Sequence, residues 1–252
     1  MTLHTESASL GAWSSLGEPH VVLSLLAARP DWVVLDAQHG AFDGSSVRAA
    51  LLASRHAPGR VPVWVRTPDG SPSTLGAVLD MGADGVIVPM VESAEQARAI
   101  TAACMYPPQG SRSFGPSTLL SGEAITSMAD ANAAVAVSLM IETAAALEDV
   151  QRIAATDGAE SLFVGPFDLA ASLGTTVDAL LADDAPDAPL PRVVEAAHTA
   201  GLRARGFAGG LERALRMREL GFDAVAGFTD TSLIQAGAAA AVAQWREAAT
   251  KR

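Results

Sequence analysis

Two carboxylates in this sequence each come after a short apolar run. Glu142 directly follows Ser138–Ile141, and Asp168 comes four residues after Ser161–Val164. Either acid alone is typical of a first helical turn, where a carboxylate complements the helix dipole. If the two runs are neighbouring strands, both carboxylates lie close together, and close carboxylates must share a proton or a cation. A pair that leaves coordination sites for water and substrate is typical of Mg²⁺ or Mn²⁺.

A histidine and an arginine follow two earlier apolar runs. His39 comes three residues after Asp36 in a loop, close enough for the aspartate to orient the imidazole and set its tautomer. Arg66 closes Pro62–Val65, and its fork can meet a carboxylate or an enolate through two hydrogen bonds. The alternatives are a structural hydrogen bond for His39 and a solvated side chain for Arg66. At one common site, both residues would be functional.

These residues require a scaffold that brings strand ends together. Runs rich in Val, Ile and Leu recur between longer Ala-rich helical segments, which predicts a parallel sheet with helical crossovers. Eight strands in 252 residues suit a TIM (β/α)8 barrel, in which the active site lies at the carboxyl ends of the strands. The expected strands are Leu10–Trp13, Trp32–Asp36, Val61–Arg66, Gly85–Pro89, Val135–Ile141, Ser161–Val164, Arg203–Phe207 and Ala224–Gly227.

A doubly wound open sheet would show the same alternation of strands and helices. The chain has no G-x-G-x-x-G motif after its first strands and no Walker sequence, which removes the usual reasons to prefer a nucleotide-binding open sheet. We therefore expect a single barrel domain of the α/β class over residues 1–252.

Several helix boundaries can be read from local signals. Ser93 with Gln96 predicts a capping box, and Gly201 and Gly221 follow helical runs as expected C′ residues. The segment Thr231–Lys251 predicts a long Ala-rich C-terminal helix. Such a helix packs either on its own barrel or on a neighbouring subunit.

The charge and hydropathy of the chain exclude several classes of partner. A formal net charge of −11 disfavours nucleic acid and anionic membranes, which require a basic surface. No stretch reaches the roughly 20 apolar residues that span a bilayer, and Met1–Ser9 lacks the pattern of a signal peptide. Cys104 is the single cysteine, which suits a reducing compartment, and a buried thiol is its ordinary interpretation. We expect a soluble, cytoplasmic protein that binds small molecules.

Six segments of the chain form a more specific pattern. They are Leu10–Trp13, Asp31–Gly40, Val88–Glu92, Tyr106–Gly110, Met140–Thr143 and Phe163–Leu169. In this order they resemble the HpcH/HpaI aldolase family, the class II, metal-dependent pyruvate aldolases of the 4-hydroxy-2-oxoheptanedioate aldolase type. The resemblance extends from about Leu10 to Gly227.

The resemblance implies a fold, an assembly and a reaction. The fold is a TIM barrel, and the assembly is a hexamer, a trimer of dimers with C-terminal helices exchanged between subunits. The reaction makes and cleaves 4-hydroxy-2-oxo acids through the enolate of pyruvate or a related 2-oxo acid, with an aldehyde as acceptor. The cofactor is a divalent metal cation, Mg²⁺ or Mn²⁺ in first place and Co²⁺ or Zn²⁺ as alternatives.

The same resemblance implies roles for individual residues. Glu142 and Asp168 match the metal ligands. Arg66 matches the residue that stabilises the enolate, and His39 with Asp36 matches the proton-transfer pair.

Other matching residues would line the substrate pocket. The segment Gly165, Pro166, Phe167 and Asp168 would offer backbone N–H groups to the substrate carboxylate at a helix start. Trp13 and Met140 would lie near the bound 2-oxo acid.

Three residues depart from the family pattern. Gln38 stands where the best-known members have Glu, which lowers the negative charge near the metal. Met140 stands where some members have Gln, and Met105 where Arg commonly precedes Tyr-Pro-Pro. The two methionines leave the preferred acceptor aldehyde open.

The lysine content bears on the type of aldolase. Lys251, at the C-terminal end, is the only lysine of the sequence. Class I chemistry needs an internal lysine for its Schiff base, so the sequence favours a metal.

Two alternative functions fit the same scaffold. An acyl-CoA ester lyase of the citrate lyase β-subunit type would need basic residues for the CoA phosphates, and the acidic chain shows no such cluster. A non-catalytic barrel that binds 2-oxo acids would not need Arg66, His39, Glu142 and Asp168 together.

Overall fold

The computed structural model describes residues 8–115 and 127–250. Two of the expectations above concern segments outside these residues. They are the signal-peptide interpretation of the first residues and the position of Lys251.

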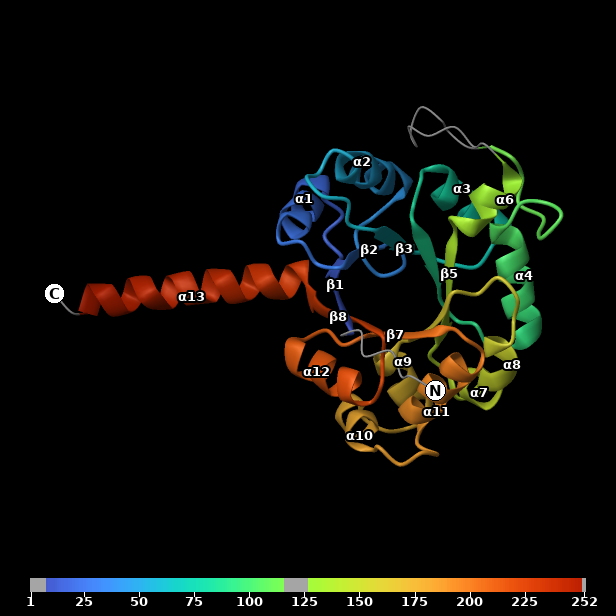
Figure 1. The fold of residues 1–252 in the computed structure, drawn as a ribbon. Coiled ribbons are helices and arrows are strands. Elements are labelled where there is room, and N and C mark those ends of the chain that lie inside the picture. The colour runs from blue at the N-terminus through green and yellow to red at the C-terminus, as the bar shows by residue number, and fades with distance from the viewer. Residues whose placement is uncertain (1–7, 116–126, 251–252) are drawn as a thin grey trace.

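Eight parallel strands close into a barrel in the order of the sequence (Figure 1). All eight expected strands are confirmed, and with them the TIM barrel. Strand β3 begins later than expected, after Pro62, which has no N–H and contributes only its carbonyl oxygen to the N–H of Val33. The strands are β1 Ser9–Ser14, β2 Trp32–Asp36, β3 Val63–Arg66, β4 Gly85–Val88, β5 Ala136–Ile141, β6 Ser161–Val164, β7 Arg203–Phe207 and β8 Ala224–Thr229.

Helices surround the barrel on its outer side (Figure 1). The described helices are α1 Pro19–Ala27, α2 Gly44–Ser54, α3 Pro72–Asp80, α4 Ala94–Cys104, α6 Met128–Ala133, α7 Ala144–Glu148, α8 Val150–Ala154, α9 Pro166–Ser172, α10 Val177–Ala182, α11 Pro189–Thr199, α12 Leu211–Glu219 and α13 Asp230–Thr250. Gly201 and Gly221 have φ values of 75° and 96°, so both take the left-handed conformation expected of C′ residues.

The expected capping box of α4 is only half correct. The hydroxyl of Ser93 accepts the N–H of Gln96 at 3.2 Å, as expected. The carboxamide of Gln96, however, accepts the N–H of Glu92 rather than that of Ser93. The expectation for Cys104 is confirmed, because the thiol is buried and burial raises its pKa to about 12.

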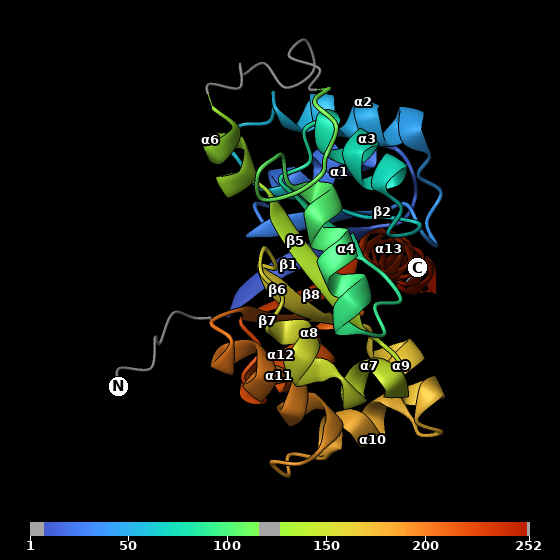
Figure 2. The ribbon, with the colours of Figure 1, turned by 90° about the vertical axis from the view of Figure 1, so that its right-hand side faces the viewer.

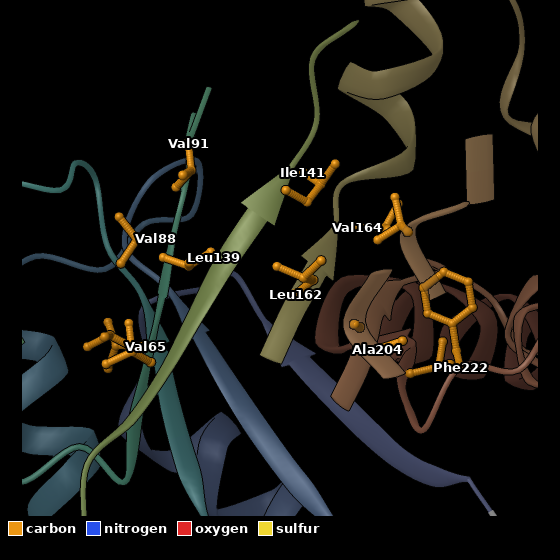
Figure 3. Packing of buried hydrophobic residues seen from close by; sticks show 14 of the residues in the cluster. Val65, Val88, Val91, Leu139, Ile141, Leu162, Val164, Ala204 and Phe222 are labelled. Atoms are coloured by element: carbon orange, nitrogen blue, oxygen red, sulfur yellow. The ribbon is translucent and has the colours of Figure 1, made fainter. Parts of the chain in front are cut away.

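Alternating side chains along the strands build two apolar layers. The outer layer lies between the sheet and the helices, and Figure 3 shows Val65, Leu139, Ile141 and Leu162 as part of it. The inner layer fills the barrel and comprises Trp13, Trp32, Val34, Trp64, Ile87, Met140, Phe163, Ala224 and Ala226. The barrel interior is therefore filled by side chains rather than open as a channel.

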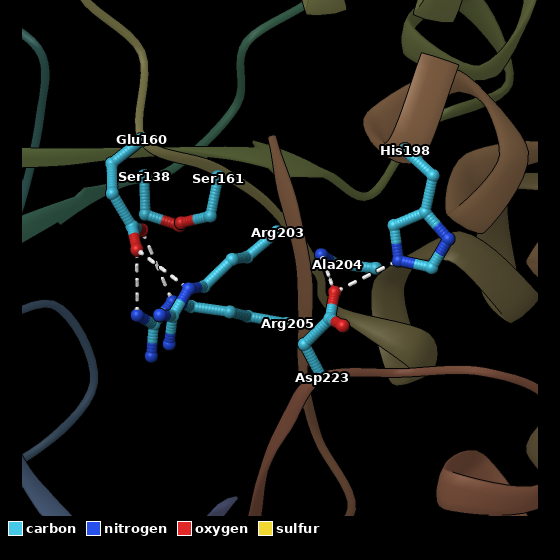
Figure 4. A network of polar contacts seen from close by, with 8 residues as sticks. All are labelled: Ser138, Glu160, Ser161, His198, Arg203, Ala204, Arg205 and Asp223. Carbon is cyan, nitrogen blue, oxygen red and sulfur yellow. Dashed lines mark hydrogen bonds and ion pairs between the residues drawn. The ribbon is translucent and has the colours of Figure 1, made fainter. Parts of the chain in front are cut away.

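The amino-terminal end of the barrel is closed by a buried arginine. Arg205 is 6% exposed, and its guanidinium lies 4.4 Å from the ring centroid of Trp64 and 5.5 Å from that of Trp32. Its Nη2 donates to Glu160 Oε1 at 2.8 Å (Figure 4). Gly11 makes room for the ring of Trp32, to which a Cβ on this glycine would come within 2.4 Å.

Three aspartates at the same end tie neighbouring strands together. Each aspartate stands just before an even-numbered strand, and its carboxylate accepts an N–H of the preceding strand at 2.7 or 2.8 Å. The N–H of each aspartate donates in turn to the carbonyl oxygen of that partner residue on the preceding strand. The pairs are Asp31 with Leu10, Asp84 with Val63 and Asp223 with Ala204.

Helix α13 extends away from the barrel (Figure 1), and Figure 2 shows it end-on. It carries exposed apolar side chains at Leu233, Ile234, Val242 and Trp245. Across the described ranges, no helix combines the length and apolar character needed to span a membrane.

Candidate active site

A pocket of about 290 Å³ opens at the carboxyl ends of the strands. It brings together nearly all the residues that the sequence predicted for the site. The lining residues are Trp13, Ser15, Asp36, His39, Arg66, Met140, Gly165, Pro166, Phe167, Asp168, Phe207 and Thr229. Glu142 lies directly behind this lining, with an exposed fraction of 2%.

Asp36 and Arg66 form a buried ion pair across β2 and β3, where the two residues are register partners. Arg66 Nε donates to Asp36 Oδ1 at 2.9 Å, and Nη2 donates to Oδ2 at 2.7 Å. Trp13 Nε1 also donates to Asp36 Oδ2, at 3.2 Å. Burial would raise the pKa of Asp36, but the bonds and charge of Arg66, with those from His39 and Trp13, outweigh it, so the pKa is lowered.

His39 is exposed at the pocket edge. Asp36 Oδ1 accepts the backbone N–H groups of Gln38 and His39, both at 3.1 Å. Among the described residues, the hydrogen bonds of this carboxylate involve Arg66, Trp13 and these N–H groups. The expectation that Asp36 orients the imidazole is therefore wrong. Asp36 fixes the backbone of the His39 loop, because its oxygens are already occupied by a guanidinium and an indole.

Glu142 is held by a neighbouring loop rather than by its own helix. The cap of α7 is Thr143, whose hydroxyl accepts the N–H of Ala146 at 3.1 Å. Glu142 Oε1 accepts the N–H of Met90 at 2.7 Å. Its Oε2 lies against Gly165, where a Cβ would come within 2.7 Å of this oxygen. The helix-capping interpretation therefore does not apply to Glu142.

The environment of Glu142 raises its pKa above the ordinary value of a glutamate. Burial raises its pKa, and the negative charge of Asp168 raises it further. The N–H of Met90 and the positive charges of Arg66 and His39 act in the opposite direction but do not cancel the shift. Asp168 lies in the first turn of α9 and is exposed. The two carboxylates thus interact electrostatically, as expected from neighbouring strands.

This donor set fits an oxygen-preferring divalent cation. In residues 8–115 and 127–250, no group of three or more His, Cys, Asp or Glu side chains could hold a metal by itself. Glu142 and Asp168 are two carboxylates whose charges interact at this site, and a pair of carboxylates that leaves positions for water or substrate is typical of such an ion. Because residue 165 is glycine, Glu142 Oε2 is free of the Cβ that would otherwise lie 2.7 Å from it, which fits a carboxylate that binds an ion.

The remaining walls of the pocket are aromatic. The ring centroid of Trp13 lies 4.9 Å from that of Phe207, and that of Phe167 lies 6.0 Å from Phe207. Met140 lines the same pocket. Met105 does not line the pocket, because it is the C-cap residue of α4. No direct contact with the pocket therefore supports the suggested effect of Met105 on the acceptor preference.

Three lining residues were missed by the sequence analysis, namely Ser15, Phe207 and Thr229. The backbone N–H of Ser15 donates to the buried Asp230 at 2.9 Å, and its carbonyl oxygen accepts the N–H of Ala41 at 2.7 Å. Ser15 directly follows β1, and Phe207 and Thr229 are the last residues of β7 and β8. These positions at strand ends could have identified the three residues from the sequence.

Comparisons with known proteins identify a family. The HpcH/HpaI aldolase/citrate lyase family model matches residues 9–236. A hydroxypyruvate/pyruvate aldolase of Roseovarius nubinhibens is 34% identical, over 94% of this chain and 92% of its own. A 4-hydroxy-2-oxovalerate aldolase of Novosphingobium aromaticivorans is 35% identical, over 94% and 90%.

A solved structure shows the same fold over the whole barrel. It is that of an HpcH/HpaI aldolase/citrate lyase family protein from Burkholderia cenocepacia, with a TM-score of 0.86, 30% identity and 95% of both chains covered. The match of the family model, the identity to these relatives and the shared barrel lead to one assignment. The chain belongs to the HpcH/HpaI aldolase/citrate lyase family.

Proposed function

We propose that the protein is a class II aldolase, a carbon–carbon lyase that makes and cleaves 4-hydroxy-2-oxo acids. Its donor is pyruvate or a related 2-oxo acid, and its acceptor is an aldehyde. The observation that carries this proposal is that Asp168 and Arg66 line one pocket and that their charges act on Glu142, directly behind its lining, in a chain of this family. The names of the two aldolase relatives, each aligned with 94% of the chain, support the same reaction.

Membership of the family implies a divalent metal cofactor, for which we propose Glu142 and Asp168 as ligands and Mg²⁺ or Mn²⁺ as the ion. When bound, such a cation supplies Lewis-acid polarisation of a carbonyl oxygen. Glu142 keeps one oxygen on Met90 and directs the other towards Gly165. Asp168 is exposed and adds the second negative charge from α9.

Arg66 stabilises the negative charge that develops when a proton leaves the carbon next to the carbonyl group. Asp36 binds its Nε and Nη2, so the guanidinium cannot rotate away from the pocket. The guanidinium carbon also lies 5.0 Å from the ring centroid of Trp13, which supports its plane from one side. Arg66 is thus oriented before the substrate arrives, and little reorganisation is needed during the reaction.

His39 moves the proton of the aldol hydroxyl group. Its imidazole is exposed at the edge of the pocket, and histidine is the side chain that most often acts as a general acid or base. Backbone N–H groups at the start of α9, between Gly165 and Asp168, bind the substrate carboxylate. Trp13 and Met140 cover the apolar part of the 2-oxo acid and exclude water from it.

The alternative of an acyl-CoA ester lyase is less well supported. The pocket lining contains Arg66 and His39 as its basic side chains, and Arg66 is already paired with Asp36. A cavity of about 290 Å³ suits a small 2-oxo acid and aldehyde better than a CoA thioester.

Exchange of the methyl protons of pyruvate with deuterated water tests the proposal directly. We expect NMR to show exchange with Mg²⁺ or Mn²⁺, loss of exchange with a chelator, and loss in Glu142→Gln and Arg66→Met. Exchange that continues unchanged after chelation would reject the metal-dependent mechanism. Aldehydes of graded length and charge, supplied with pyruvate, would then identify the acceptor.

We also propose that the protein is a cytoplasmic homo-oligomer, a hexamer in which α13 contacts another subunit. The exposed apolar side chains of α13 support this assembly, since isolated helices rarely keep such residues in water. The single, buried Cys104 suits a reducing compartment.

A further inference from the structure

The loop after β4 contains a residue in an unusual backbone conformation. Met90 has a φ of 56°, a left-handed value that residues other than glycine rarely adopt. Its side chain is 47% exposed, so burial of the methionine does not explain the conformation. Its backbone N–H, in contrast, points inward and donates to Glu142 Oε1 at 2.7 Å. The strained conformation serves to deliver this N–H to a buried carboxylate.

A side chain from the following helix holds the loop in this conformation. Gln96 Nε2 donates to the carbonyl oxygen of Met90 at 3.0 Å, and Gln96 Oε1 accepts the N–H of Glu92 at 2.9 Å. One carboxamide therefore binds both ends of the segment 90–92. The hydroxyl of Ser93 accepts the N–H of Gln96 at 3.2 Å and thereby fixes the start of α4.

We propose that Gln96 is a positioning residue for Glu142, acting through Met90. Gln96 itself lies outside the pocket lining. By holding the carbonyl oxygen of Met90, it keeps the N–H of the same residue on Oε1 of Glu142. With Oε1 fixed, Oε2 faces Gly165 and stays available to a cation. This inference rests on the proposed role of Glu142 as a metal ligand.

The dissociation constant of Mn²⁺, measured by electron paramagnetic resonance without substrate, tests the proposal. Gln96→Ala removes both carboxamide bonds, and we expect it to weaken Mn²⁺ binding about tenfold, the lower end of the range for residues that orient metal ligands. Gln96→Glu keeps an acceptor for Glu92 but loses the donor to Met90, so it should also weaken binding. At saturating Mn²⁺, kcat should return close to that of the wild type. Glu95→Ala, from the same helical turn, is the matched control and should leave Mn²⁺ binding unchanged.

A second background separates positioning from a general loss of stability. Glycine adopts a positive φ without strain, so Met90→Gly makes the loop less dependent on Gln96. We expect Gln96→Ala to weaken Mn²⁺ binding less in Met90→Gly than in the wild type. An equal loss in both backgrounds, or wild-type affinity in Gln96→Ala, would overturn the positioning role. If Glu142→Gln binds Mn²⁺ as the wild type does, the metal site itself is rejected, and the role of Gln96 falls with it.

Discussion

The guanidinium of Arg66 lies across the carboxylate of Asp36, with Nε 2.9 Å from Oδ1 and Nη2 2.7 Å from Oδ2. The side chains are 10% and 4% exposed, so the pair is nearly removed from water. A buried pair of this kind adds little net stability while intact, but removal of one partner leaves an uncompensated charge. The pair therefore orients Arg66 more than it stabilises the fold.

Asp36→Asn tests this relationship through stability. It leaves Arg66 buried without its counter-ion, and we expect a loss of about 3–5 kcal/mol in the free energy of unfolding. Urea denaturation measures this loss, and kcat/KM for the aldol reaction should fall at the same time. Asp223→Asn, at the opposite end of the barrel, is the control and should leave kcat/KM unchanged. Equal stability of Asp36→Asn and the wild type would contradict a buried ion pair.

The lowered pKa of Asp36 gives the pair a pH dependence with a definite sign. The folded state binds fewer protons than the unfolded state, in which the pKa is about 3.9. The resulting stability is fully present above this pH and is lost as the pH falls through the lower, folded pKa. In urea titrations, the difference in the free energy of unfolding between the wild type and Asp36→Asn should become smaller as the pH falls from about 5 to about 2. An advantage that stays constant over this range would contradict the lowered pKa.

The fold could be predicted from the sequence almost completely, because most strands are short apolar runs that end at Gly, Pro or a polar residue, although β7 contains two arginines. The strand ends then indicated which polar residues share one rim, and Asp36, Arg66 and Asp168 do line one pocket. Family resemblance supplied the reaction, which the spacing of these residues did not contain.

Other parts of the site depend on loop geometry that no periodic pattern encodes. The bond from Met90 to Glu142 requires a positive φ at a methionine, which no residue preference would indicate. Likewise, Asp36 could reach His39 by sequence separation, yet its oxygens bind Arg66 and Trp13 from other strands. Donors from other strands, Arg66 and Trp13, therefore bind this carboxylate in place of the His39 imidazole.

Gly165 tests whether the space beside Glu142 is functional. In Gly165→Ala, the added Cβ would lie 2.7 Å from Glu142 Oε2 and 2.9 Å from Met140 Cε, so the carboxylate must shift. We expect weaker Mn²⁺ binding and at least a tenfold lower kcat/KM, by the same reasoning on misplaced ligands. Gly76→Ala is the matched control, because a Cβ on this α3 residue meets nothing within 4 Å. The control should retain activity and gain about 0.5–1 kcal/mol in stability.

Metal-free Glu142→Gln should be more stable than the metal-free wild type at neutral pH. The pKa of Glu142 is raised mainly by burial, so the folded state binds more protons than the unfolded state. The contribution of Glu142 to the free energy of unfolding is most favourable below the unfolded pKa of about 4.3, and it declines as the pH rises through the folded pKa. Thermal melts in the presence of a chelator should give a higher Tm for Glu142→Gln than for the wild type at pH 7, and this difference should disappear near pH 4. A variant less stable than the wild type at pH 7 would contradict the cost of burying this carboxylate.

The apolar residues of α13 predict how assembly responds to single charges. At 100° per residue, Ile234, Val242 and Trp245 fall within about 80° of one another on the helix, and Trp245 is 78% exposed. Trp245→Asp places a charge on this face, and we expect sedimentation to show smaller species than for the wild type. Ala243→Asp adds the same charge about 80° or more from each of these residues and from Leu233, and it should leave the assembly intact. A wild-type protein that sediments as a monomer, or equal behaviour of the two variants, would show that this face is not an interface between subunits.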